Sequence, residues 1–389
     1  MSLRDLLAQM GAETGRDRGR MRHLFQKYGV TTNPFPSSNE SRDLPHLEGE
    51  VDRQIAERVR VFQTTPHRSQ VILIQGTQGV GKTNLLDWYE KQFEELLSEE
   101  DGYTLIRYYP DPDPSFDLIL HRIFDDLQQN QLLEALGNSL SQLGEDEFTE
   151  VIQTVEHADF RALLRCLRAA AESGKALLSE TGILAVEWMV GMRLLRRHRD
   201  ALGVRMRLDT LEGKTRVLRD LVKVTGKLNL LHGIFLLLDE LEKLDQTVSK
   251  VAVTRFLLAV RALIDALPHN LFLMLAMTPS ARDRYFSFVP ALAARLQIRL
   301  RLEPIRDEEE AISLYDLYLT HARNKARSEG ELESWTPGDD PILTEQEVEQ
   351  VFQKLRRDAE RFAIAGVTQR QFLHHIHLKA EEKLSPGKG

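Results

Sequence analysis

Five short runs of apolar residues stand out along the chain, and each is short enough to be a buried β-strand. Several are continuous rather than alternating, a pattern typical of strands covered on both faces of a parallel sheet. Turn residues or helical patterns bound each run. The predicted strands are Val71–Ile74, Thr104–Tyr109, Gly233–Leu238, Leu271–Met277 and Ile298–Leu302.

Between and after these runs the apolar residues recur at helical spacing. Amphipathic helices are predicted over Glu50–Phe62, Val251–Leu267, Asp307–Arg327 and Glu345–Ala363, and a last helix opens near Gly366. Residues 115–231 are almost wholly helical in pattern. This piece is long for a connection between two strands of one sheet. The alternation of strands and helices therefore predicts an α/β fold with a helical insertion over residues 115–231.

Composition places the chain among ordinary globular proteins. It has 389 residues, with 42% hydrophobic and 28% charged residues and a formal net charge of -8. Cys166 is the single cysteine, which excludes an internal disulfide framework. The N-terminus is too charged for a secretory signal. The apolar stretch Ala176–Leu195 is interrupted by Ser179, Glu180 and Glu187, so it predicts a buried helix and no membrane span. The expected location is the cytoplasm.

The stretch Val71–Asn84 carries the clearest chemistry. A β-branched strand leads into G-x-x-x-x-G-K-[ST], and a helical pattern follows. Glycines let backbone N–H groups point at an anion, and the helix start adds its positive dipole end. Lys82 is expected to reach the β- and γ-phosphates of ATP, and Thr83 to bind Mg²⁺; a glycine-rich turn without a ligand is the alternative. The predicted ATP-binding residues are Gly76, Thr77, Gln78, Gly79, Val80, Gly81, Lys82, Thr83 and Asn84.

Acidic and polar residues follow two of the other strands. Asp239 and Glu240 come directly after Gly233–Leu238. We expect Asp239 to hold the Mg²⁺ shell and Glu240 to polarise the attacking water, which favours hydrolysis over passive binding. A strand ending in an acidic helix cap is the alternative. Thr278 follows Leu271–Met277, either as a sensor of the γ-phosphate or as a plain strand-to-loop threonine.

Basic residues are concentrated in two segments. Residues 191–227 contain eleven Lys or Arg against four acids, including Arg196, Arg197 and Arg199. Such a density could follow the phosphate backbone of double-stranded DNA without sequence preference, and a solvated helical face is an equal alternative. Arginines also crowd the first 32 residues, where a solvated arm is favoured over a nucleic-acid contact. No His/Cys cluster has the spacing of a metal site.

These motifs together resemble the AAA+ ATPases, in particular the initiator-like clade. The matching residues are GTQGVGKT at Gly76–Thr83, LLLDE at Leu236–Glu240, the strand ending at Thr278, and the helix start at Gly366–Arg370. The resemblance implies a parallel sheet in the order 5-1-4-3-2 and a C-terminal helical lid. It assigns Thr278 and Arg370 as sensors. It also implies a homo-oligomer in which Arg295 acts on the neighbour's nucleotide, with Arg282 and Arg284 as rivals.

A second resemblance concerns Glu187–Leu244, which is similar to ATP-binding proteins of bacterial phage-defence islands of the BREX kind. The expected organisation is an N-terminal basic arm (1–32), an AAA+ core (33–303) containing the insertion, and a helical lid (304–389). The expected function is an ATPase that couples nucleotide state to oligomer assembly on DNA or on a phage-defence or mobile-element complex. A nucleotide-gated switch that recruits a partner effector, with slow turnover, is the alternative. Protein partners encoded nearby are expected in both cases.

Overall fold

The computed structural model of the protein describes residues 24–37, 44–65, 68–98, 102–109, 115–129, 131–244, 249–330 and 340–384. Within them the chain forms two compact units. The first contains residues 1–49, 76–88 and 302–389, and the second contains residues 50–75 and 89–301. Helix α3 (Lys82–Ser98) begins in the first unit and continues into the second. Most of the predicted N-terminal basic arm lies outside the described residues.

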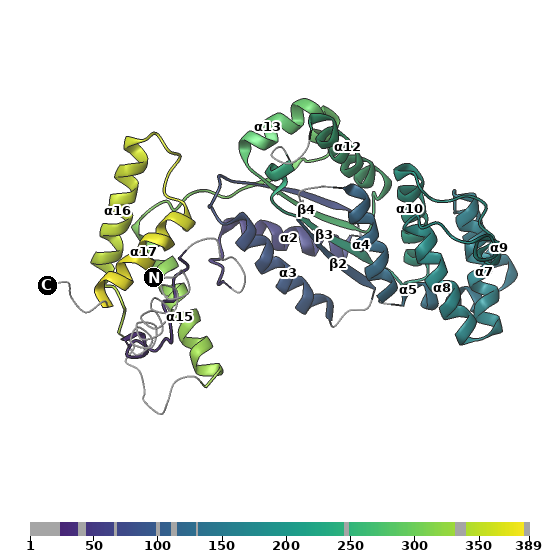
Figure 1. Ribbon diagram of the computed structural model, residues 1–389, viewed down its shortest axis with the longest axis horizontal. Coiled ribbons are helices and arrows are strands. Elements are labelled where there is room, and N and C mark those ends of the chain that lie inside the picture. Colours follow the sequence, from purple (N-terminus) through teal and green to yellow (C-terminus); the bar gives the residue numbers. More distant parts are fainter. Residues whose placement is uncertain are drawn as a thin grey trace, which may run out of the picture. The chain divides into compact units, whose positions relative to one another are not determined.

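The second unit is built on a five-stranded parallel sheet (Figure 1). Its strands are β1 (Gln70–Gln75), β2 (Tyr103–Tyr108), β3 (Gly233–Leu238), β4 (Leu271–Met277) and β5 (Ile298–Arg301). The spatial order is β2-β3-β4-β1-β5, so the predicted α/β fold and the predicted order are confirmed. The central strands β1, β3 and β4 are buried at every residue, as their continuous apolar runs predict.

Helices cover both faces of this sheet. On one face, Phe62 of α2 (Glu50–Thr64) and Phe93 of α3 pack against Phe235 and Phe272 of the central strands. On the other face, α4 (Phe116–Gln129) and α12 (Lys250–Ala266) meet the sheet, and Phe256 of α12 stacks on Tyr108 of β2. Burial of these aromatic rings is a large part of the free energy that holds the layers together.

Residues 115–231 fold as helices, as their pattern predicts. These are α4, α5 (Leu132–Gln142), α6 (Glu145–Gln153), α7 (Ala158–Ser173), α8 (Lys175–Met189), α9 (Arg196–Leu202) and α10 (Leu211–Lys227). Helix α7 packs against α5 and α8. Trp188 of α8 is fully buried, and its indole N–H donates to the Met206 carbonyl at 2.9 Å. The hydrophobic core formed by these helices is continuous with the core around the sheet.

The second unit is completed by a 3-10 turn at Leu241–Lys243 and two helices, α13 (Pro279–Phe288) and α14 (Pro290–Ala293). The helices of the first unit are α15 (Glu308–Ser328), α16 (Glu345–Arg361) and α17 (Gln369–Leu384). They share a hydrophobic core with Phe25, Val30 and Phe35. Thr344 and Glu347 form a capping box that fixes the start of α16.

Candidate nucleotide-binding site

The phosphate loop joins the end of β1 to the start of α3. Gly79 and Gly81 adopt φ values of 81° and 107°, which residues with a side chain rarely adopt. Helix α3 begins at Lys82, so its unpaired N–H groups and positive dipole end face the loop, as an anion site requires. Gln78 is exposed, whereas Val80 is buried and Thr83 is half-buried.

Lys82 is held inside the loop itself. Its side chain is buried, and Nζ donates to the carbonyl oxygens of Gly76 at 3.0 Å and Thr77 at 3.3 Å. The buried Thr77 hydroxyl has no hydrogen-bond partner among the described residues. A positioned cation, a hydroxyl without a partner and a glycine-shaped backbone fit a phosphate chain.

The start of α17 packs onto this loop within the same unit. The Arg370 backbone N–H donates to the Gly79 carbonyl at 3.1 Å. A methyl group added at Gly79 would lie 3.1 Å from Arg370 Cβ, and one added at Gly81 would lie 2.7 Å from Gln369 Oε1. Positive φ therefore favours glycine at both positions, and at Gly79 the nearby Arg370 Cβ leaves little room for a side chain as well. The structure places Arg370 beside the loop, and its assignment as a sensor stays a prediction.

Asn84 connects α3 to the segment before α2. Its side-chain amide donates to the Pro45 carbonyl at 3.1 Å, and its oxygen lies 2.9 Å from His46 Nδ1. The His46 ring also lies beside Trp88, with centroids 5.8 Å apart. In the structure, Asn84 therefore anchors this segment against α3.

The acidic pair after β3 lies beside an arginine that sequence reasoning missed. Asp239 is completely buried, and its Oδ2 accepts a hydrogen bond from Arg107 Nη2 at 2.9 Å. Its Oδ1 accepts the backbone N–H of Glu240 at 2.7 Å. Arg107 lies on β2, and its side chain is only 6% exposed. The one signal in the sequence is a charged residue within the otherwise apolar run TLIRYY.

Glu240 has a strained backbone and a partner of its own. Its φ is 49°, in the left-handed region that non-glycine residues avoid. Its carboxylate forms an ion pair with Lys243, one turn further on. The side chain is 33% exposed, so it is accessible to water. Positive φ at such a position is common at functional sites, where the surrounding fold supports the strain.

Thr278 follows β4 at the same sheet edge, because Gln75 is in register with Met277 and Leu238 with Leu275. Its hydroxyl caps α13 by accepting the Ala281 N–H at 3.3 Å. Arg282 of α13 donates to Oε1 of Gln75 at 3.1 Å. Gln75 is the last residue before the phosphate loop. The ends of β1, β3 and β4 therefore bring these polar groups to one edge.

Arg295 lies elsewhere. It precedes β5, at the edge where the parallel strands begin, whereas Asp239 and Thr278 follow their strands at the opposite edge. Its Nε donates to Asp265 at 2.8 Å, and the side chain is 39% exposed. Within one chain the structure does not bring Arg295 together with Asp239, Glu240 or Thr278.

The described residues contain no group of three or more His, Cys, Asp or Glu side chains placed to hold a metal ion. A single carboxylate is compatible with Mg²⁺, which keeps several waters and binds substrate phosphates. No helix among the described residues has the length and apolar character needed to cross a membrane.

Comparisons with known proteins give one family. Residues 111–374 match the family model described as BREX system ATP-binding protein BrxC/D. Among curated proteins no relative matches this chain.

Among solved structures, the ORC2 protein of Aeropyrum pernix in its ADPNP–ADP complexes matches with a TM-score of 0.40 and 14% identity over 90% of this chain and 72% of that one. The ORC1 protein of Aeropyrum pernix in complex with DNA matches with a TM-score of 0.39 and 13% identity. The match covers 87% of this chain and 61% of the ORC1 chain. The chain thus spans less than two thirds of that second protein.

Proposed function

The chain belongs to the family of BREX system ATP-binding proteins BrxC/D, and we propose that it hydrolyses ATP and couples its nucleotide state to assembly of an oligomer. The observation that carries the proposal is the phosphate loop, with Lys82 buried among the loop carbonyls and α17 packed on Gly79. Through that packing, a change of nucleotide state would reach the helical part of the first unit.

The residues divide the chemistry among themselves. The loop N–H groups and Lys82 bind the phosphates. Thr83 and Asp239 are the residues that would hold Mg²⁺, and the ion would offset phosphate charge. Glu240 orients and polarises the attacking water after it leaves Lys243. Thr278 and Arg370 contact the γ-phosphate side. Arg295 serves the nucleotide of a neighbouring subunit, since it lies away from its own chain's acidic pair.

Two substitutions separate binding from hydrolysis. Glu240→Gln is expected to keep ATP bound while lowering turnover by about two to three orders of magnitude, because a charged group that acts in the transition state is lost. Lys82→Ala is expected to weaken ATP binding itself. Binding is measured with a fluorescent nucleotide and turnover by phosphate release. Unchanged turnover in Glu240→Gln would remove Glu240 from catalysis, and unchanged affinity in Lys82→Ala would contradict the phosphate-loop assignment.

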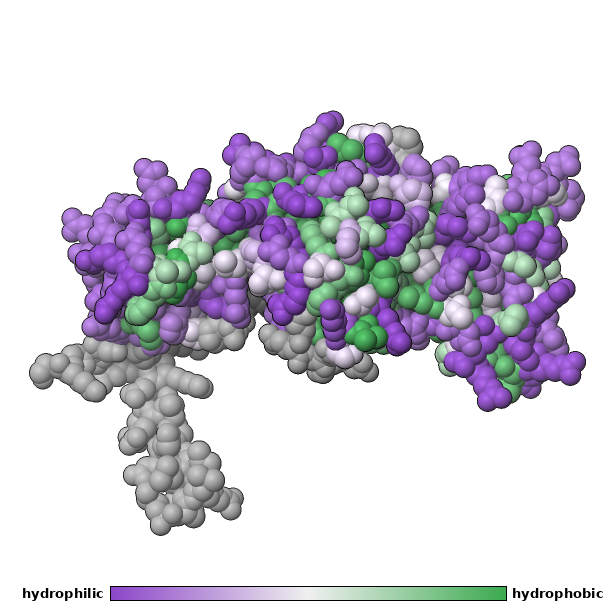
Figure 2. Space-filling model, turned by 90° about the horizontal axis from the view of Figure 1, so that it is seen from above, coloured by the Kyte–Doolittle hydropathy of each residue, from purple (hydrophilic) through white to green (hydrophobic). Residues whose placement is uncertain are grey.

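We further propose that double-stranded DNA is a partner, bound through the segment 193–207. On α10, the basic side chains Lys214 and Arg219 are used in ion pairs with Asp117 and Glu156. In the segment itself, Arg193 and Arg205 are exposed and have no ion pair within the described part of the chain, and Arg196 forms an exposed pair with Asp200 at 3.8 Å. Figure 2 shows mainly hydrophilic residues over the visible face of this helical region, at the right.

Charge reversal tests this contact. Replacing Arg196, Arg197 and Arg199 by Glu is expected to weaken DNA binding for any sequence and to flatten its salt dependence, because phosphate contacts release counterions. The matched control reverses Arg306 and Arg356, two exposed arginines outside this segment. Binding is measured by fluorescence anisotropy at several salt concentrations. If the parent binds no duplex at low salt, a solvated basic face remains, together with the alternative of a nucleotide-gated switch that recruits a protein partner.

A further inference from the structure

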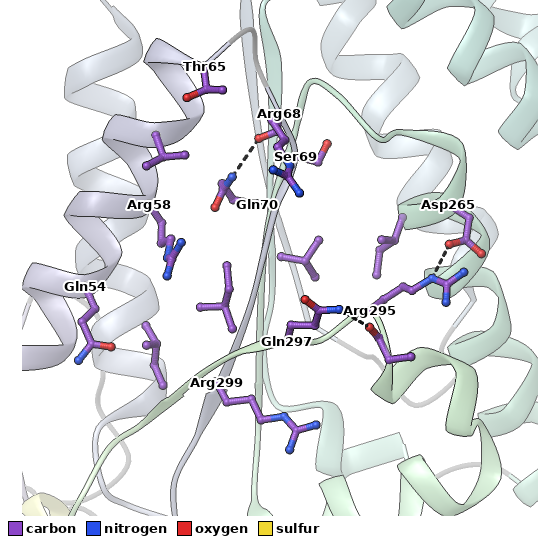
Figure 3. Close-up of a pocket in the computed structure, with 16 residues that line it drawn as sticks. Gln54, Arg58, Thr65, Arg68, Ser69, Gln70, Asp265, Arg295, Gln297 and Arg299 are labelled. Atoms are coloured by element: carbon purple, nitrogen blue, oxygen red, sulfur yellow. Dashed lines mark hydrogen bonds and ion pairs between the residues drawn. The ribbon is translucent and has the colours of Figure 1, made fainter.

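A groove of about 840 Å³ lies in the second unit, at the edge of the sheet where β1 and β5 begin (Figure 3). It is far from the strand ends that carry Asp239 and Thr278, because all strands of the sheet are parallel. Helix α2 forms one wall, and the end of α12 with the segment after α14 forms another. Its volume is in the range of small-molecule sites, about 300–1,000 Å³.

The groove is strongly basic. Four arginines line it: Arg58, Arg68, Arg295 and Arg299. One acidic residue, Asp265, lines it as well. This balance is opposite in sign to that of the whole chain, whose formal net charge is -8. A concave surface lined by charge of one sign concentrates its field and attracts ions of the other sign.

The single carboxylate in the lining is already shared. Asp265 accepts from Arg295 Nε at 2.8 Å and pairs with Arg261 at 3.3 Å, and Figure 3 shows the Arg295–Asp265 bond on one side of the groove. On the opposite wall, Glu57 precedes Arg58 in the sequence. Its carboxylate forms a salt bridge with Arg60, with 2.7 Å between Nη2 and Oε1. Among the described residues, Arg58, Arg68 and Arg299 form no salt bridge, although Glu57 still attracts Arg58 through space.

The side-chain amides of Gln70 and Gln297 are neutral, so they do not offset the arginine charge either. Gln70 Nε2 donates to the Arg68 carbonyl at 3.1 Å, and Gln297 Nε2 donates to the Ala294 carbonyl at 3.2 Å, so two backbone acceptors of the lining are occupied. Arg299 donates from Nε to the Leu296 carbonyl at 3.2 Å, and its guanidinium lies 5.6 Å from the centroid of the Phe286 ring. These contacts hold the Arg299 side chain in place without neutralising its charge.

We propose that this groove is a second anion site, which binds a free ligand carrying a chain of two or more phosphates. Guanidinium groups make paired hydrogen bonds to phosphate oxygens. Here they come from three separate segments: Arg58 from α2, Arg68 from the stretch before β1, and Arg299 from β5. Guanidinium groups from three segments suit a chain of phosphates better than a single phosphate. The proposal does not depend on hydrolysis at the phosphate loop.

The test measures binding of inorganic tripolyphosphate to the full chain by calorimetry at low salt. The starting protein carries Lys82→Ala, which removes the cation of the phosphate loop. Adding Arg58→Gln and Arg299→Gln is expected to lower the affinity at least about tenfold, since two charge-assisted contacts are lost. Adding Arg306→Gln and Arg356→Gln instead removes the same charge outside the groove, where Arg306 and Arg356 pair with Glu310 and Glu360. This control is expected to change affinity less than about twofold.

The remaining outcomes decide the proposal. Circular dichroism, and nucleotide binding by the groove variants with Lys82 restored, show whether these variants are folded. Absence of tripolyphosphate binding to a folded starting protein would overturn the proposal, as would equal losses in the groove and control pairs. Binding seen only when chains associate would instead assign the phosphates to a neighbour's nucleotide. Binding of a short DNA duplex but not of tripolyphosphate would make the groove a nucleic-acid contact. Each of these last two results would reject the proposal that the groove binds a free polyphosphate ligand.

Discussion

The buried ion pair between Arg107 and Asp239 allows a quantitative prediction. The two side chains are 6% and 0% exposed, with Nη2 and Oδ2 2.9 Å apart. At an effective dielectric constant of about 20, two unit charges at this separation attract by about 6 kcal/mol. Desolvation of both ions offsets much of this gain, so the pair as a whole stabilises the fold little. Removing one partner is different, because the other charge then stays buried without compensation.

We therefore expect Arg107→Leu to lower the free energy of unfolding by about 3–5 kcal/mol. This is a large share of the roughly 5–15 kcal/mol typical of a folded protein. Arg107→Lys, which keeps the charge, is expected to lose less. In the double variant Arg107→Leu with Asp239→Asn, no charge remains to be buried. Its loss should be smaller than that of Arg107→Leu alone.

The measurement is urea unfolding followed by circular dichroism, with the three variants and the parent compared under one condition. Arg122→Leu is the matched control, because Arg122 is exposed and donates to the Arg107 carbonyl at 3.0 Å. It should change the free energy of unfolding by less than about 1 kcal/mol. A change below about 1 kcal/mol in Arg107→Leu, or a double variant no more stable than Arg107→Leu, would refute the reasoning.

Two further predictions concern the subunit interface and pH. Arg295→Ala should bind ATP normally but hydrolyse it poorly, and mixing it with Glu240→Gln should restore some phosphate release, because one composite interface keeps both groups; full-rate hydrolysis by a protein that stays monomeric with ATP would contradict this. Burial lowers the pKa of His157 below its ordinary value of 6.5, although Asp159 and Asp220 oppose the shift. His157 therefore takes up a proton more readily in the unfolded chain than in the folded one. The free energy of unfolding should be highest above pH 6.5 and should fall as the pH drops below 6.5. The ring packs against Trp188, so Trp fluorescence during urea unfolding reports the loss, and His157→Gln should reduce this dependence; an unchanged dependence would exclude His157 as its source.

The elements of this protein that depend on residues close together along the chain follow from its sequence. The strands β1, β3 and β4 are continuous apolar runs, and the structure places them within a residue or two of the prediction. The phosphate loop follows from glycines and Lys82 at fixed spacing between a strand and a helix, because backbone geometry over eight residues requires those types. The sheet order came from the AAA+ resemblance, and it is confirmed.

Contacts between residues far apart in the sequence depend on the three-dimensional fold. Arg107 and Asp239 are 132 positions apart, and no periodicity indicates that a charged residue of β2 will pair with the acid that follows β3. The contact of Arg370 with Gly79 depends on how the last helix returns to the loop. Arg295 likewise pairs with Asp265 at the edge where the strands begin. Pattern and propensity describe neighbours along the chain, whereas charge pairing depends on where parallel strands and their connecting helices bring segments together in space.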